Sequence, residues 1–124
     1  MFSHIMIGTN DLDRAKSFYD TVLGTLGVPP ARVDGHRIFY MTPGGIFSVS
    51  KPIDGQPATC ANGGTVGFAA ASPAAADAWH AAGVAAGGTA IEDPPGVREG
   101  SAGKLYLAYL RDPDGNKICA LHRM

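Results

Sequence analysis

Reactive side chains are sparse in this sequence and widely spaced along it. Two cysteines, Cys60 and Cys119, and four histidines are the only sources of a thiol or an imidazole. A thiolate can bind a soft metal ion or attack an electrophile, and an imidazole can bind a metal or move a proton. Two cysteines do not make a disulfide framework, so we expect both thiols to be reduced, as in the cytoplasm.

Two cations flank a short glycine-containing segment in the second half of the chain. Arg98 and Lys104 stand on either side of Glu99-Gly-Ser-Ala-Gly103. A mobile segment between two cations is suited to holding an anion, so the pair is a candidate anion clamp. The alternative is that both are solvated surface charges, which contribute little. The sequence alone leaves both interpretations open.

The sequence contains an internal repeat, and this repeat determines where the candidate side chains lie in the fold. Ala15-Lys-Ser-Phe-Tyr19 corresponds to Ala76-Asp-Ala-Trp-His80, sixty-one residues later. The turn Thr42-Pro-Gly-Gly45 corresponds to Asp112-Pro-Asp-Gly115, seventy residues later. An insertion between the two pairs accounts for the larger offset. A repeat of this kind predicts two similar structural units.

Hydrophobic spacing predicts the same order of elements in each half: a strand, a helix, and then about three strands. In the first half we expect a strand over residues 4–7, a helix from Asn10 or Asp11 to Gly24 or Gly27, and a hairpin over 37–41 and 46–51. In the second half we expect a strand over residues 65–69, a helix from Ser72 to Gly88, a loop over 91–103, and strands over 104–111 and 117–121. These elements form one domain of residues 1–124, with repeats over 1–57 and 62–124.

Composition indicates a packed domain. Hydrophobic residues make up 45% of the 124 residues, charged residues 17%, and the net charge is −1. This balance gives no basic surface that would attract nucleic acid or a membrane. No apolar run approaches the ~20 residues of a membrane span. Each half is too short to bury both faces of its sheet, so the halves must pack together. We therefore predict an α+β fold of two βαβββ modules, whose sheets close on each other and leave a concavity for a ligand.

Two segments carry a resemblance to a known family. His4-Ile-Met-Ile-Gly-Thr-Asn-Asp-Leu-Asp-Arg-Ala-Lys-Ser-Phe-Tyr19, followed by Val22-Leu-Gly24, resembles the opening of the vicinal-oxygen-chelate superfamily. Arg111-Asp-Pro-Asp-Gly-Asn-Lys-Ile118 resembles its last hairpin. The superfamily includes glyoxalase I, fosfomycin and bleomycin resistance proteins, and extradiol dioxygenases. The resemblance covers essentially the whole chain. It implies the glyoxalase-like fold, in which two βαβββ modules form cup-shaped sheets, usually as a homodimer.

Glyoxalase-type members hold a divalent metal such as Zn, Ni or Mn with four ligands, two from each half. By resemblance, the first position is His4, the second Ser48 (or Phe47, depending on the register), the third Thr65 and the fourth Cys119. Only His4 is a typical ligand at its position, and Cys119 could add a thiolate. The carboxylate that moves the proton in glyoxalases has no counterpart, and the nearest spare acids are Glu92 and Glu99.

Other candidates depend on the faces of the last strands. By resemblance, Tyr109 occupies a cup-facing polar position, and Leu107 would share its face. Tyr109 could bind a ligand through its hydroxyl group, or it could be a space-filling tyrosine at the rim. Cys119, with a lowered pKa beside His4, could be a nucleophile, and the alternative is an inert buried thiol. Cys119 and Tyr109 are thus the catalytic candidates, and Tyr109, Arg98, Lys104, Leu107, Thr65 and Ser48 are the ligand-binding candidates.

The resemblance implies a homodimeric protein, which we place in the cytoplasm, that binds a small organic molecule in a cup-shaped site. The reaction it implies is that of a lyase or isomerase of the lactoylglutathione lyase type, in which a metal polarises the substrate oxygen. The alternative is a metal-free protein that binds or sequesters its ligand, as in bleomycin resistance. We expect neither nucleic acid nor a membrane as a partner.

Overall fold

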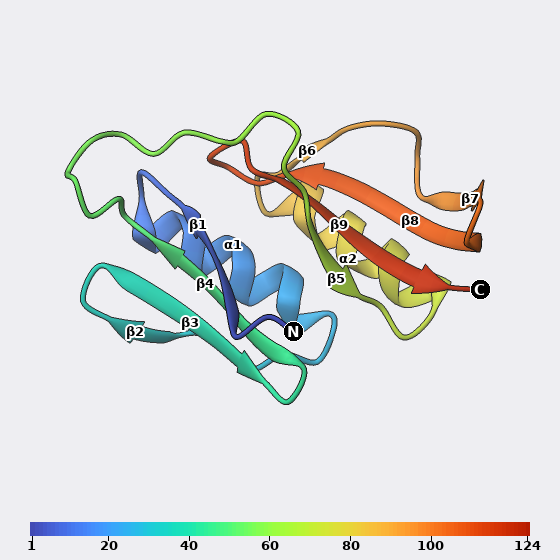
Figure 1. The fold of residues 1–124 in the computed structure, drawn as a ribbon, viewed down its shortest axis with the longest axis horizontal. Coiled ribbons are helices and arrows are strands. Elements are labelled where there is room, and N and C mark those ends of the chain that lie inside the picture. The colour runs from blue at the N-terminus through green and yellow to red at the C-terminus, as the bar shows by residue number, and fades with distance from the viewer.

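The computed structural model describes residues 1–124, which form two sheets with two helices behind them (Figure 1). The first half contains β1 (His4–Gly8), α1 (Leu12–Gly24), β2 (Arg32–Asp34), β3 (Arg37–Thr42) and β4 (Gly45–Ser50). The second half contains β5 (Val66–Ala69), α2 (Pro73–Ala85), β6 (Thr89–Ala90), β7 (Gly96–Gly100), β8 (Gly103–Arg111) and β9 (Lys117–Arg123). The strand orders are β1-β4-β3-β2 and β5-β9-β8-β6, with β7 also paired to β8. The predicted α+β class is confirmed, with β1 and β5 as corresponding edge strands.

The helices begin where local sequence signals place them. The side chain of Asp11 accepts a 3.0 Å hydrogen bond from the backbone N–H of Arg14, which caps α1. Ser72 caps α2 in the same way through the N–H of Ala75 at 3.1 Å, and Pro73 follows as the first helical residue. Both caps satisfy backbone donors that the first helical turn leaves free. Each helix has 13 residues.

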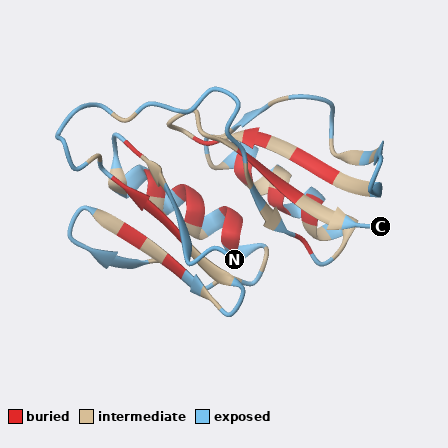
Figure 2. Cartoon of the chain, in the orientation of Figure 1, coloured by how far each residue is buried: buried red, intermediate tan, exposed pale blue.

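One hydrophobic core joins the two halves. Its 16 buried residues come from both helices and from the helix-facing sides of both sheets. Figure 2 shows the buried positions along α1, α2 and the strands in front of them. Trp79 of α2 is completely buried, as are Tyr19 and Val22 of α1. Because the cluster is continuous, neither half buries its apolar face alone.

The sheet register separates a helix-facing side from an open side. In β9, Ile118 and Ala120 belong to the core cluster, whereas Cys119 between them does not. In β4, Phe47 and Val49 belong to the core, whereas Ser48 between them does not. Alternate residues of a strand point to opposite faces, so Ser48 and Cys119 point to the open side.

The predicted loop over residues 91–103 is wrong in its second half. Gly96–Gly100 forms β7, which pairs antiparallel with β8 through a tight turn at Gly103, whose φ is +102°. The prolines and glycines of this segment suggested a loop, but the two prolines precede β7, and Gly96 and Gly100 are themselves paired with β8. The short strands β2 and β6 also lacked a clear sequence signal, and α2 ends at Ala85, before the predicted glycines.

The turn between β8 and β9 fastens the second half to the first. The carboxylate of Asp114 accepts hydrogen bonds from Thr9 Oγ1 at 2.5 Å and Asn10 N at 2.9 Å, and pairs with Arg14 at 2.8 Å. Asn116 Nδ2 donates to the carbonyl oxygen of Gly8 at 3.0 Å. The two segments that carry the family resemblance are therefore in direct contact. Neither helix has the length and apolar character needed to span a membrane.

Candidate functional site

His4 opens β1 and pairs with Ile46 of β4. Its side chain is exposed, and Nδ1 lies 2.8 Å from the hydroxyl oxygen of Ser3. Strand alternation places His4 on the open side of its sheet, together with Ser48. No hydrogen bond links it to Cys119, which lies in the other sheet.

Cys119 lies on the open side of the second sheet, between Tyr109 of β8 and Gly67 of β5. A Cβ atom at Gly67 would lie 3.2 Å from its Sγ, so the missing side chain makes room for the thiol. The thiol is nevertheless almost inaccessible, with 6% of the residue exposed. Burial raises the pKa of Cys119 above its usual value, with a smaller rise from Glu92 and an opposing effect of Lys117. A nucleophilic cysteine needs the opposite shift.

The two hydroxyl residues at family metal positions are not arranged as ligands. Ser48 is completely buried, and its Oγ donates a 2.8 Å hydrogen bond to the carbonyl oxygen of Ile38. Thr65 is exposed and precedes β5 by one residue. The hydroxyl of Ser48, which faces the open side near β1, is thus already used within the sheet.

The residues present do not fit a catalytic divalent metal. Nowhere do three His, Cys, Asp or Glu side chains come together closely enough to hold one. The four family positions supply one imidazole, one thiol of raised pKa and two hydroxyls, whichever chain of a dimer they come from. Catalytic zinc usually has three protein ligands of the imidazole, carboxylate or thiolate type. We therefore derive no step through a metal ion.

Tyr109 and Leu107 lie on the open side of β8, opposite Cys119 and Leu121 of β9. Leu107 is 8% exposed and forms an apolar floor with Cys119. The ammonium of Lys117 lies 5.0 Å from the centre of the Tyr109 ring. Burial raises the pKa of the Tyr109 hydroxyl, which stays protonated at neutral pH.

Arg98 and Lys104 do not converge on one point. Arg98 pairs with Leu105 and Lys104 with Glu99 in the β7–β8 hairpin, so the two cations lie on opposite faces. The guanidinium of Arg98 donates to the carbonyl oxygens of Asp93 and Pro94 at 3.0 and 3.1 Å. Lys104 pairs with the Glu99 carboxylate at 3.6 Å in solvent. This geometry favours the interpretation as separate surface charges over the clamp.

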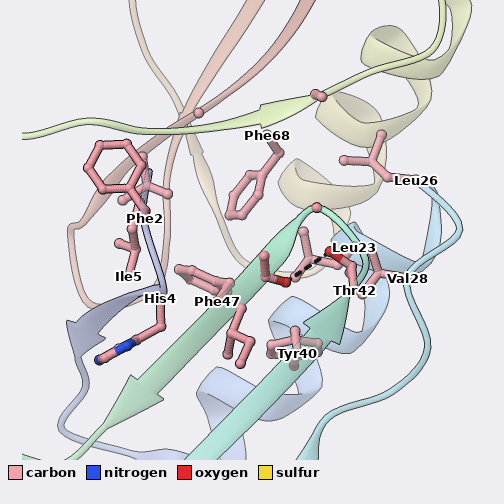
Figure 3. Close-up of a pocket in the computed structure, with 16 residues that line it drawn as sticks. Phe2, His4, Ile5, Leu23, Leu26, Val28, Tyr40, Thr42, Phe47 and Phe68 are labelled. Carbon is pink, nitrogen blue, oxygen red and sulfur yellow. Dashed lines mark hydrogen bonds between the residues drawn. The ribbon is translucent and has the colours of Figure 1, made fainter.

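An apolar pocket of about 380 Å³ lies between the edge strands of the two halves (Figure 3). We call it the seam pocket. Sixteen residues line it, 11 of them hydrophobic: Phe2, His4, Ile5, Leu23, Leu26, Val28, Tyr40, Thr42, Gly44, Gly45, Ile46, Phe47, Val66, Gly67, Phe68 and Ala69. Phe47 and Phe68 meet edge to face, with ring centres 5.1 Å apart. Figure 3 shows Phe2, Ile5, Phe47 and Phe68 around the hollow, with the His4 ring directed away from it.

The polar atoms beside the seam pocket are already hydrogen-bonded within the protein. The Tyr40 hydroxyl donates to Asp20 Oδ1 at 2.8 Å, and the Thr42 hydroxyl donates to the Gly45 carbonyl at 2.9 Å. Few polar partners therefore remain for a ligand, and the pocket is suited to an apolar molecule.

Of the sequence candidates, only His4 and Phe47, the alternative to Ser48, line the seam pocket. Cys119, Tyr109 and Leu107 form a separate group on the open side of the second sheet. The aromatic residues of the pocket were missed as site residues because the sequence shows them as ordinary strand and core positions. Phe47 was considered only as an alternative register for a metal position.

Comparison with known proteins agrees with the fold and the two signature segments. A family model described as Glyoxalase/Bleomycin resistance protein/Dioxygenase superfamily matches residues 1–120. The chain belongs to this superfamily. The glyoxalase-like fold predicted by resemblance is thus confirmed.

Within the superfamily, solved structures match over nearly the whole chain. A glyoxalase/bleomycin resistance protein from Albidiferax ferrireducens T118 is 63% identical, with a TM-score of 0.98 and 99% of each chain covered. A glyoxalase-related enzyme from Fulvimarina pelagi is 19% identical, with a TM-score of 0.75 over 99% of this chain and 88% of that chain. Lactoylglutathione lyase from Agrobacterium tumefaciens is 22% identical, with a TM-score of 0.67 over 98% and 92%. The last two show a common fold alone. A search of curated proteins found no match.

Proposed function

We propose that this superfamily member binds a small, largely apolar organic molecule in the seam pocket without the help of a metal ion. The observation that carries this proposal is the pocket itself, which both halves line and whose walls are mainly aliphatic and aromatic. Its volume of about 380 Å³ lies within the range of small-molecule sites. The two free thiols, Cys60 and Cys119, suit a reducing, cytoplasmic setting.

The ligand class follows from the lining. Phe47 and Phe68 present ring faces and edges to the hollow, and aromatic pairs of this kind favour a flat aromatic guest. A guest of one or two rings would displace water from apolar walls, which is favourable by roughly 25 cal/mol per Å² of apolar area. This form of the proposal corresponds to a binding or sequestering protein, because the lyase reaction needs a metal centre that the donor set does not fit.

We further propose that the protein acts as a homodimer. Apolar side chains are exposed on β1 and β3: Met6 is 41% exposed and Met41 is 54% exposed, and Phe2 beside the pocket is 70% exposed. Met6 and Met41 share the open side of the first sheet with His4. Exposed apolar groups gathered on one sheet face are typical of a surface that another chain covers. Light scattering should give twice the chain mass, and Met41→Lys should shift the protein towards the monomer.

The test of ligand binding uses neutral 2-naphthol as the probe. In protein treated with EDTA, fluorescence titration should show saturable binding of one molecule per chain. Leu26→Trp should weaken this binding at least about tenfold, because the larger side chain fills the pocket. Val84→Trp is the matched control, since Val84 is exposed on α2 and does not line the pocket. Equal affinity in both variants, or binding only after a metal is added, would refute the proposal.

A further inference from the structure

Glu92 has an unusual backbone conformation. It is the only residue other than glycine with a positive φ, at 58°. For a side chain of this kind that region costs roughly 1–3 kcal/mol and persists only when a contact holds it. The contact is present: the Glu92 carboxylate forms an ion pair with the ammonium of Lys117.

Lys117 is held from two sides on the open face of the second sheet. It is the first residue of β9, and strand alternation places it on the same face as Cys119. Its ammonium stands 5.0 Å above the centre of the Tyr109 ring and also contacts Glu92. A ring face and a carboxylate both attract an ammonium, so the position of this charge is fixed in the folded protein.

The open face beside this charge is mainly apolar and flat, and Arg98 of β7 is a second cation on it. Leu107 and Cys119 are nearly buried beside Tyr109, and Gly67 on the next strand has no side chain. The second sheet therefore offers a fixed cation at the edge of a flat apolar floor. None of Glu92, Tyr109, Lys117, Leu107 or Cys119 lines the seam pocket.

We propose that Lys117 is a binding site for the carboxylate of a small organic acid with a flat apolar body, and that Glu92 occupies this site while the ligand is absent. The acid group pairs with the ammonium, and the flat body covers Tyr109 and Leu107. This site is independent of the seam pocket and of the neutral ligand proposed there.

Replacing the Glu92 carboxylate by that of the ligand at Lys117 has a small net cost in free energy. Lys117 is already paired, so the ligand replaces an existing ion pair and does not have to strip water from a free ammonium. Release of Glu92 also relieves the strained backbone at that residue. The ion pair between Lys104 and Glu99 lacks these features, because it is 3.6 Å long, both side chains are mostly exposed, and Glu99 has an ordinary strand conformation. It provides a matched control.

The ¹⁵N-labelled protein is titrated with benzoate, the acidic probe, and separately with benzyl alcohol, its neutral counterpart. NMR spectra report the binding of each. Benzoate should shift the amide signals of residues 107–119 and of the segment around Glu92. Lys117→Met should weaken benzoate binding about tenfold or more, because it removes the charge and keeps the apolar stem. Glu92→Gly should strengthen it about fivefold, since it removes the competing carboxylate and suits the positive φ. Lys104→Met should change nothing.

Two results would overturn this proposal. One is an equal affinity for benzoate in the wild type and Glu92→Gly, which is decisive even if Lys117→Met fails to fold. The other is an equal affinity for benzoate and benzyl alcohol. Binding of 2-naphthol in the seam pocket should be unaffected by either variant, so failure here and failure of the proposed function give different results.

Discussion

The hydroxyl of Tyr19, in α1, donates a 2.6 Å hydrogen bond to Oδ2 of Asp112, at the start of the turn between β8 and β9. Both residues are buried, with Tyr19 at 0% and Asp112 at 4% exposure. Burial, followed by the charge of Asp112 and the hydrogen bond to it, raises the pKa of Tyr19 well above its usual value. The hydroxyl therefore stays protonated and remains a donor at neutral pH. This bond joins the two halves whose packing forms the seam pocket.

Tyr19→Phe should lower the free energy of unfolding by about 1–3 kcal/mol, because it leaves a buried carboxylate without one of its donors. Chemical denaturation followed by circular dichroism measures the change. Tyr106→Phe is the matched control: its hydroxyl donates to Asp77 at 2.7 Å, but at an exposed position. That variant should lose less than about 0.5 kcal/mol. Equal losses in the two variants would contradict a special role for the Tyr19 bond.

Gly83→Ala should destabilise the protein although alanine is the better helix former. A Cβ atom at this position of α2 would lie 2.2 Å from Cδ1 of Leu110, which is completely buried. Overpacking of this kind costs about 1–3 kcal/mol, more than the roughly 1 kcal/mol of helix propensity gained. Gly24→Ala is the control, since a Cβ atom there meets nothing within 4 Å. Thermal unfolding should show a lower Tm for the first variant and an unchanged or higher one for the second.

Asp20 should make the protein sensitive to acid. Burial raises its pKa, but hydrogen bonds from Lys16, the N–H of Ala31 and the Tyr40 hydroxyl outweigh this, so the folded pKa lies below the usual 3.8. A carboxyl group with a lowered folded pKa contributes stability above the unfolded pKa, and this contribution is lost as the pH falls through the folded one. Asp20→Asn should thus reduce stability at pH 7 and flatten its decline below about pH 4. Asp34→Asn, on an exposed strand, is the control and should change the stability at pH 7 by less than about 0.5 kcal/mol.

The two thiols should react at different rates. Cys60 is exposed, whereas Cys119 is buried and has a raised pKa. At pH 7.5 a disulfide reagent such as DTNB should modify Cys60 at least about tenfold faster than Cys119. In Cys60→Ser only the slow phase should remain, and in denaturant both thiols should react quickly. Fast modification of Cys119 in the folded protein would revive the interpretation as a nucleophile.

Local signals in the sequence predicted both helices and the longer strands, but not β2, β6 or β7. Asp11 and Ser72 cap their helices because a capping side chain needs only the next turn of backbone. Strand alternation likewise explains why Ile118 and Ala120 face the helices while Cys119 between them faces the open side. Each of these predictions depends on residues close together in the chain, where propensity and periodicity apply.

The sites depend on long-range arrangement, which the sequence does not display. The seam pocket is lined by residues of both β1 and β5, and Phe47 and Phe68 meet only after both halves pack. The strained backbone of Glu92 and its pairing with Lys117 depend on the course of the segment before β7, which pattern reasoning treated as a plain loop. Alternation along β7 and β8, once β7 is recognised, separates Arg98 from Lys104.

The most direct test of metal-independent ligand binding is a crystal structure of the EDTA-treated protein with 6-bromo-2-naphthol, in which anomalous scattering locates the bromine atom. We expect one bromine peak per chain inside the seam pocket, with the rings of the ligand against Phe47 and Phe68. A peak beside Tyr109 on the open side of the second sheet, or no ordered ligand at a saturating concentration, would contradict the proposal.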